Sequence, residues 1–297
     1  MRLIENAALA TMTSPVRHVM AYIHVALVNI APEKREAFDR DFADFTIEYL
    51  DDWHWVCNVN VDTRHIRLSR GVVEFIWASA LMYFRLQQSA QGTSGGTDVD
   101  LKTHPILGPS AALLLWVYKR DSEQPWPTGL PAPVPNPTHA SDLQVADELC
   151  LGAIALILYH ELAHIRFLHR GQSEVDSERD ADYFATDWIM GSVDANSLEF
   201  TKRSLCVAVA LGVTAAQEIQ AREPGGITHP RGFDRLVNSL DRHVHNPNHV
   251  AWDTVGLILA FHLQDVGGTV ITPKEGFASA RDCVDAHVEA LSRLRPH

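Results

Sequence analysis

The fold of this chain is decided by the stretch LGAIALILYHELAH, residues 151–164. Its first nine residues are apolar or small on every side, which is typical of a helix buried in a protein core. His160 and His164 lie four positions apart, so a helix places them on one face, where both imidazoles can bind the same metal ion. Glu161 can then reach a water molecule on that ion without binding the ion itself. Because buried polar side chains need partners, a chance pattern on a surface helix is the weaker interpretation.

A second helix, expected over residues 174–190, supplies the third metal ligand. Glu178 and Asp182 lie one turn apart on one face of this helix. We assign Glu178 as the third ligand, and we expect Asp182 to hydrogen-bond the free nitrogen of a metal-binding histidine. Glu174 and Asp176 are alternative ligands on other faces, and a solvated acidic surface is the interpretation without a metal. Two histidines and a glutamate predict a zinc ion with one coordination position left open for water.

The pattern H-E-x-x-H followed by E-x-x-A-D resembles the gluzincin peptidases of the HtpX and CAAX-prenyl types. Those families carry a later segment that is similar to THPRGFDRL at residues 228–236. The resemblance implies that His229 lies in the active site and stabilises the oxyanion, and that Arg235 lies behind the metal ligands. It also implies a zincin-like fold of the α+β class, mostly α, in which helices and a small β-hairpin or sheet surround the buried helix.

The layout of most of the chain resembles the Lit-type phage-exclusion peptidases. The similar stretches are IAPEK at 30–34, EFIWA at 74–78, Trp126-Pro127, YHELAH at 159–164 and ERDAD at 178–182. At His229 the chain is more similar to the wider gluzincin group. The Lit resemblance implies a cytoplasmic bacterial zinc endopeptidase that a phage-derived peptide activates during infection. Its substrate would be a host translation factor such as elongation factor Tu.

Composition and charge argue against several other classes. The chain has 25 basic and 37 acidic residues and a net charge of −12, whereas nucleic-acid binding needs a basic surface. The four cysteines are scattered without a C-x-x-C pair, which fits a reducing cytoplasm. The apolar run over residues 19–31 and the uncharged run over 204–217 are both too short to span a bilayer, so a membrane protein is not expected.

We expect a single zinc peptidase domain over residues 1–297. It comprises an N-terminal hairpin and helical part (1–124), a proline-rich loop (125–140) and a catalytic helical part (141–297). Ser141 is the expected cap of the helix that carries the two histidines. Further helices are expected over residues 33–52, 71–88, 107–118, 198–221, 250–263 and 277–294.

Alternating side chains predict a β-hairpin in the N-terminal part. Trp55, Cys57 and Val59 fall on one face of the first strand, and residues 65–69 alternate again after a turn. A strand edge beside a catalytic helix can hold an extended peptide by main-chain hydrogen bonds. This hairpin is therefore our candidate for the substrate-binding edge.

Two other functions remain open at this point. One is a regulatory or quality-control metallopeptidase with HtpX-like chemistry. The other is a non-catalytic zinc module that binds a partner, although Glu161 argues against it because a structural zinc site needs no general base. His243, His245 and His249 could form a second metal site, but a solvated turn is the favoured interpretation.

Overall fold

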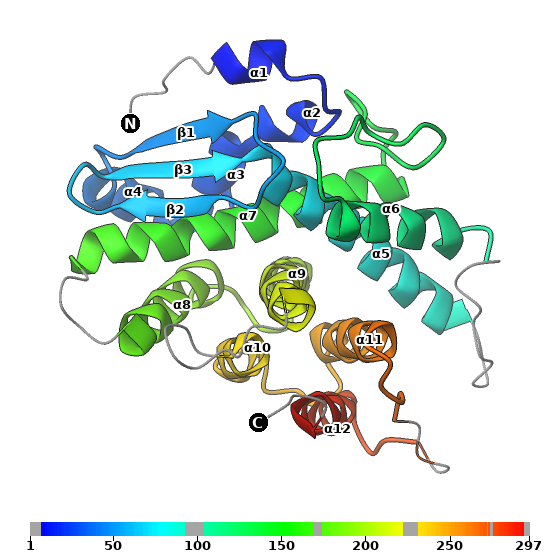
Figure 1. The fold of residues 1–297 in the computed structure, drawn as a ribbon. Coiled ribbons are helices and arrows are strands. Elements are labelled where there is room, and N and C mark those ends of the chain that lie inside the picture. The colour runs from blue at the N-terminus through cyan, green and yellow to red at the C-terminus, as the bar shows by residue number, and fades with distance from the viewer. Residues whose placement is uncertain are drawn as a thin grey trace.

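Helices make up most of the structure, and one small sheet lies on one side of them (Figure 1). The computed structural model describes residues 7–92, 104–168, 174–221, 231–271, 273 and 276–293. The elements in chain order are α1 (Ala7–Thr11), α2 (Arg17–Met20), α3 (Ile23–Asn29), η1 (Pro32–Lys34), α4 (Arg35–Asp41), β1 (Thr46–Leu50), β2 (Cys57–Asn60), β3 (His65–Ser69), α5 (Arg70–Gly92), α6 (Leu107–Lys119), α7 (Asp142–Phe167), α8 (Glu174–Met190), α9 (Leu198–Ala221), α10 (Gly232–Asp241), α11 (Val250–Asp265) and α12 (Ala280–Arg293). The expected α+β class, mostly α, is confirmed.

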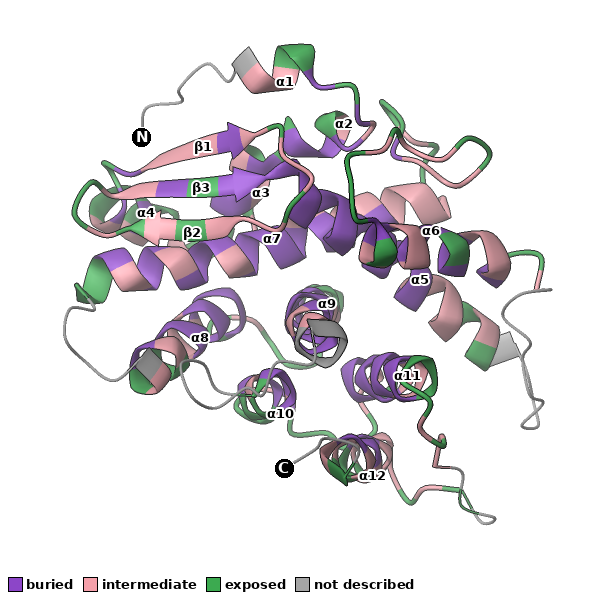
Figure 2. Cartoon of the chain, in the orientation of Figure 1, coloured by how far each residue is buried: buried purple, intermediate pink, exposed green. Residues whose placement is uncertain are grey.

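The predicted buried helix is α7, which runs through the middle of the structure. Ser141 caps its N-terminus, because the serine side chain accepts a hydrogen bond from the backbone N–H of Gln144. The helix packs against α5, α8 and α9, while the sheet lies along its other side (Figure 1). Figure 2 shows that α7 is buried along most of its length. Gly152 lets α9 come close, since a Cβ at this position would lie 2.2 Å from Sγ of Cys206.

By length and composition, α7 is also apolar enough to cross a membrane. From the sequence, only the runs over 19–31 and 204–217 were judged by this criterion, and it was not applied to this helix. Yet 72% of its most apolar window is buried inside the structure, as in the core helix of a folded domain.

The sheet has the strand order β1-β3-β2, with β3 in the middle. β2 pairs antiparallel with β3, which confirms the predicted hairpin. β1 pairs parallel with β3, so Ile47 lies beside Ile66 and Tyr49 beside Leu68. β2 is consequently an edge strand, and it packs against α7.

The helix expected over residues 33–52 is wrong in its second half. The charged part does form η1 and α4, but the helix ends at Asp41 and the chain then enters β1. The segment TIEYL gains its strand conformation from pairing with β3, whose partner residues lie about 19 positions further on. Thr46, Ile47 and Tyr49 are also residue types that are enriched in strands, so the charged composition of residues 33–41 did not extend to this segment.

Helices α8 to α12 lie on the side of α7 opposite the sheet, whereas α1 and α2 lie on the same side as the sheet (Figure 1). The helices expected over 71–88, 107–118, 198–221, 250–263 and 277–294 correspond to α5, α6, α9, α11 and α12. α10 was not expected as a separate helix. His243 pairs with Asp187 at 2.8 Å, and His249 caps α11 by accepting a hydrogen bond from the N–H of Ala251. Both histidines thus have structural roles.

Candidate metal centre and active site

The side chains of His160, His164 and Glu178 meet between α7 and α8. Nε2 of His160 lies 3.1 Å from Nε2 of His164. The carboxylate of Glu178 faces both rings, with Oε2 at 3.2 Å from Nε2 of His160 and Oε1 at 3.4 Å from Nε2 of His164. Among the described residues, this is the group of histidine, cysteine and acidic side chains close enough to share one metal ion.

The spacing of these atoms fits a zinc ion. Bonds of about 2.0–2.1 Å in a tetrahedral zinc site place neighbouring ligand atoms about 3.3 Å apart. The two Nε2 atoms are 3.1 Å apart, and each faces one oxygen of Glu178, at 3.2 and 3.4 Å, so the three side chains are close enough to share one ion. Three protein ligands leave a fourth position open, which is the arrangement of catalytic rather than structural zinc sites.

Asp182 and Arg235 form a second layer behind the histidines. Oδ1 of Asp182 lies 2.9 Å from Nδ1 of His160, so the Nδ1–H group donates to the carboxylate and Nε2 is turned towards Glu178. Arg235, on α10, donates to both oxygens of Asp182 at 2.7 Å. This chain of charge-assisted hydrogen bonds fixes the orientation and tautomer of the ring that a metal ion would need.

The charges in this cluster shift one another's pKa values in the metal-free protein. Burial alone would lower the pKa of His160, but hydrogen bonds with Asp182 and Glu178 raise it to about 10. Burial would raise the pKa of Glu178, but hydrogen bonds with His160 and His164 hold it well below its ordinary value. The metal-free cluster therefore keeps a proton where a metal ion would bind, and the metal must displace it.

Glu161 lies on the side of α7 that faces the edge strand β2. Its Oε1 is 3.9 Å from Sγ of Cys57, the first residue of β2. Burial raises the pKa of Glu161 above its ordinary value. A carboxyl group with a raised pKa exchanges protons more readily near neutral pH, which suits a general base.

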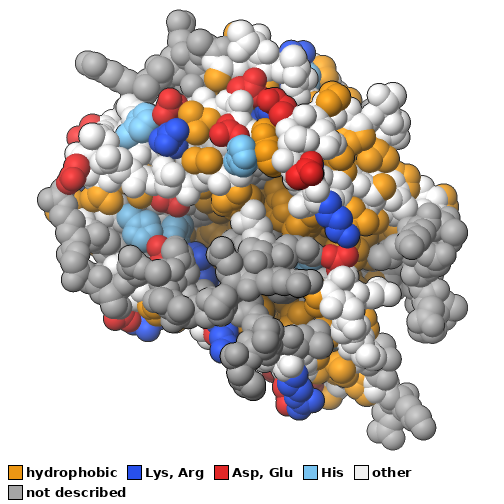
Figure 3. Space-filling view, in the orientation of Figure 1, with side chains coloured by type: hydrophobic (Ala, Val, Ile, Leu, Met, Phe, Trp, Pro, Cys, Tyr) orange, Lys and Arg blue, Asp and Glu red, His pale blue; other side chains and the backbone are white. Residues whose placement is uncertain are grey.

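This face of the molecule is recessed below the sheet. Figure 3 shows histidine side chains at one end of the recess and hydrophobic side chains along the rest of it. The side chains of His160, His164 and Glu178 keep 11–15% of their surface exposed, so they can be reached from solvent.

The sequence model of the family described as Peptidase U49 matches residues 66–255. The chain belongs to the Peptidase U49 family. The match runs from β3 to the first residues of α11 and includes the whole cluster around His160. The chain is therefore a peptidase of the Lit type, as the resemblance of its motifs indicated.

A curated relative supports the same assignment. The cell death peptidase of Escherichia coli K12 is 28% identical over 243 residues, which covers 77% of this chain and 82% of that protein. No solved structure matches the chain.

The structure brings together most of the residues that the sequence singled out for the site. His160, His164 and Glu178 share one centre, and Asp182 and Arg235 adjoin it. His229 lies outside the described residues, so its role stays a prediction.

Sequence reasoning did not place Cys57 in this U49 site. The alternation of β2 indicated which face Cys57 occupies. It did not indicate that this face meets Glu161, because the two residues are 104 positions apart.

Proposed function

We propose that this U49 peptidase is a zinc-dependent endopeptidase in which His160, His164 and Glu178 hold the ion. The observation that carries the proposal is that the two Nε2 atoms lie 3.1 Å apart and that each faces an oxygen of Glu178 at 3.2 or 3.4 Å, close to the ligand spacing of a zinc site. When bound at such a centre, zinc polarises a water molecule and the carbonyl group of the scissile peptide bond.

Other residues of the chain have separate roles in the reaction. Glu161 accepts the proton of the attacking water and delivers it to the leaving amine. Asp182 and Arg235 keep His160 oriented throughout the reaction. His229 is proposed to stabilise the developing oxyanion, a role in which one donor typically contributes about 10²–10³ in turnover.

The substrate is proposed to bind as an extended strand along β2. This strand has β3 on one side only, so its other edge offers main-chain N–H and C=O groups. Because Cys57 lies beside Glu161, a peptide paired with this edge would pass the proposed general base. The hairpin predicted from the sequence would thus serve as the substrate-binding edge.

For the biological role, we propose a cytoplasmic endopeptidase that acts in phage exclusion. Its proposed substrate is a host translation factor of the elongation factor Tu type, and its proposed trigger is a phage-derived peptide. The support is the similarity to a protein named cell death peptidase, together with membership of its family. An enzyme that stops protein synthesis must stay inactive until it is triggered, which is the reason for proposing an activator.

The test compares new protein N-termini in cells that express either the wild type or Glu161→Gln, with and without phage challenge. We expect one dominant cut that only the wild type makes, located in elongation factor Tu. A single cut in another protein would support the proposed endopeptidase activity but contradict the proposed substrate. Many scattered cuts would favour a quality-control peptidase instead.

Metal analysis of the two purified proteins completes the test. We expect about one zinc per chain in both, because Glu161 is not among the proposed ligands. If Glu161→Gln cleaves as fast as the wild type, the proposed mechanism is wrong. If zinc is bound but no cut appears under any condition, the non-catalytic zinc module becomes the better explanation.

A further inference from the structure

A buried ionic network lies at the end of the sheet where β1 and β3 end and β2 begins. Its central residue is Glu74 of α5, whose side chain is 1% exposed. Oε1 of Glu74 accepts hydrogen bonds from Oγ of Ser14 at 2.6 Å and from Nη1 of Arg70 at 2.9 Å. Oε2 forms an ion pair with Nη2 of Arg120 at 2.5 Å. The stretch EFIWA, noted in the sequence for its resemblance alone, thus contains the centre of this network.

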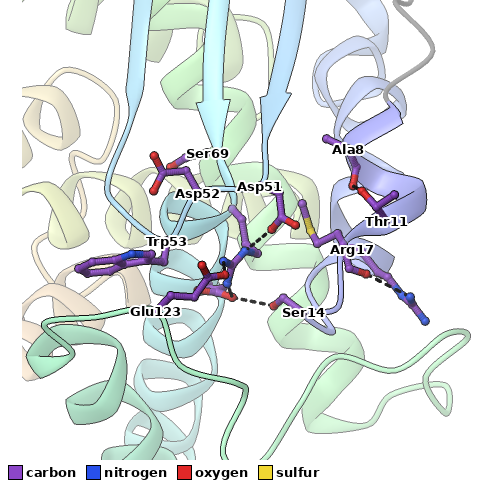
Figure 4. A network of polar contacts seen from close by, with 12 residues as sticks. Ala8, Thr11, Ser14, Arg17, Asp51, Asp52, Trp53, Ser69 and Glu123 are labelled. Atoms are coloured by element: carbon purple, nitrogen blue, oxygen red, sulfur yellow. Dashed lines mark hydrogen bonds and ion pairs between the residues drawn. The ribbon is translucent and has the colours of Figure 1, made fainter.

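Both arginines extend from Glu74 to the segment 51–56, which connects β1 to β2. Figure 4 shows Asp51, Asp52 and Trp53 of this segment in the network, with Ser14 and Glu123 beside them. Arg70 donates through Nε to Asp51 at 2.6 Å, and through Nη2 to Glu123 at 2.8 Å. Arg120 donates to the carbonyl oxygen of Trp53 at 3.0 Å. The side chains of both arginines are at most 5% exposed, whereas their outer partners Asp51 and Glu123 are 38% and 69% exposed.

Backbone contacts hold the same segment against the start of α5. The N–H of Gly71 donates to the carbonyl oxygen of Asp52 at 2.9 Å. Oγ of Ser69 donates to the carbonyl oxygen of His54 at 2.6 Å and accepts from the N–H of Val56 at 3.0 Å. The segment is thereby bound along nearly its whole length.

This segment leads directly into the substrate-binding edge. Residue 56 is followed by Cys57, whose Sγ faces Oε1 of Glu161. Within the described part of the chain, β2 has one neighbour in the sheet and comprises four residues, so strand pairing alone holds it weakly, although it also packs against α7. Its position beside Glu161 therefore depends in part on how firmly the preceding segment is anchored.

We propose that Glu74, Arg70 and Arg120 are positioning residues that set β2 at the correct place beside Glu161 for an extended peptide to bind. The inference rests on the proposed endopeptidase function. Directional ionic contacts suit this task, because buried ion pairs are best attested as devices that fix a register. The network has no contact with the metal ligands, so its loss should affect substrate binding and leave zinc binding intact.

The test that needs no substrate is amide hydrogen exchange in Glu74→Gln. This substitution keeps the size of the side chain and removes the charge that both arginines face. We expect exchange in residues 56–60 to become faster by about tenfold, with little change in α8. Arg120→Lys, which keeps the charge but loses the planar contact with both Glu74 and Trp53, serves as the second variant if Glu74→Gln does not fold.

The control is Glu33→Gln. Glu33 also faces a buried arginine, Arg203, at 2.7 Å, but this pair joins η1 to α9 and is separate from the network around Glu74. Unchanged exchange in β2 of Glu74→Gln, or an equal increase in Glu33→Gln, would overturn the proposal.

Kinetics on a peptide that spans the wild-type cut then test the link to catalysis. We expect Glu74→Gln to raise KM about tenfold while kcat and zinc content stay within about twofold. Faster exchange with an unchanged KM would overturn the role in substrate binding. If the wild type cleaves nothing, the endopeptidase proposal fails, while the exchange experiment still decides whether the network positions β2.

Discussion

Asp182→Asn tests the layer behind the metal centre most directly. Oδ1 of Asp182 accepts from His160 at 2.9 Å, and the two oxygens together accept two hydrogen bonds from Arg235 at 2.7 Å. An asparagine of the same shape has one acceptor oxygen and one NH₂ group. If its oxygen faces His160, its NH₂ group meets the Nε–H of Arg235, donor against donor.

Two losses follow from this substitution. Weaker orientation of a metal-binding histidine typically lowers metal affinity by about 10–100-fold. The guanidinium of Arg235, 11% exposed, also loses its main counter-charge, and an uncompensated buried charge costs about 3–5 kcal/mol. Glu178 lies 3.8 Å from Nη2 of Arg235 and offsets part of this loss. We therefore expect the free energy of unfolding to fall by about 3 kcal/mol, near the lower end of this range.

The assays are zinc competition with a fluorescent chelator and urea unfolding of the metal-free protein. Asp187→Asn is the matched control, because Asp187 lies on the same helix and also pairs with an arginine and a histidine, Arg242 and His243. Its side chain is 46% exposed, so we expect a loss below about 1 kcal/mol and unchanged zinc affinity. The reasoning is refuted if Asp182→Asn binds zinc as tightly as the wild type and is no less stable than Asp187→Asn.

Three further predictions concern the ligand set, the pH dependence and the packing. Glu178→Ala should lower zinc content to well below one ion per chain, measured by metal analysis after dialysis, and full occupancy would remove this residue from the ligand set. Burial lowers the pKa of His262 to about 4, so the unfolded state binds a proton more readily than the folded state. The free energy of unfolding should thus fall by about 2–3 kcal/mol as the pH drops from about 6.5 to 4. Urea unfolding of His262→Phe should show a smaller pH dependence than that of the wild type. Identical pH profiles of the two proteins would contradict this role of His262. Gly71→Ala should destabilise by about 1–3 kcal/mol, because its Cβ would lie 2.1 Å from the carbonyl oxygen of Trp53, and an unchanged thermal midpoint would show that the segment moves freely.

Local sequence patterns were sufficient to predict the elements that depend on contacts within a few residues. The apolar run before His160, the cap at Ser141 and the i, i+4 spacing of the two histidines all act within one helix, and the structure has that helix over Asp142–Phe167. α8 likewise occupies the expected range, Glu174–Met190, since its polar and apolar faces repeat with the helical period. Helical periodicity thus placed the proposed ligands on the correct elements.

Contacts between distant segments were not predicted from the sequence. β1 was expected as the end of a helix, and its parallel pairing with β3 was not predicted. The sequence named Arg235 as a neighbour of the ligands by resemblance, but its hydrogen bonds with Asp182 join residues 53 positions apart.

The sequence by itself determined the chemistry of this protein: a buried helix with two histidines and a glutamate, and a second helix with an acidic face. The tertiary structure alone decided what those groups meet. Cys57 reaches Glu161 across 104 residues, and Glu74 joins Ser14 across 60. The physical reason is that helical spacing is a property of a few consecutive residues, whereas an edge strand or a buried ion pair is stable only when the whole core has brought its partners together.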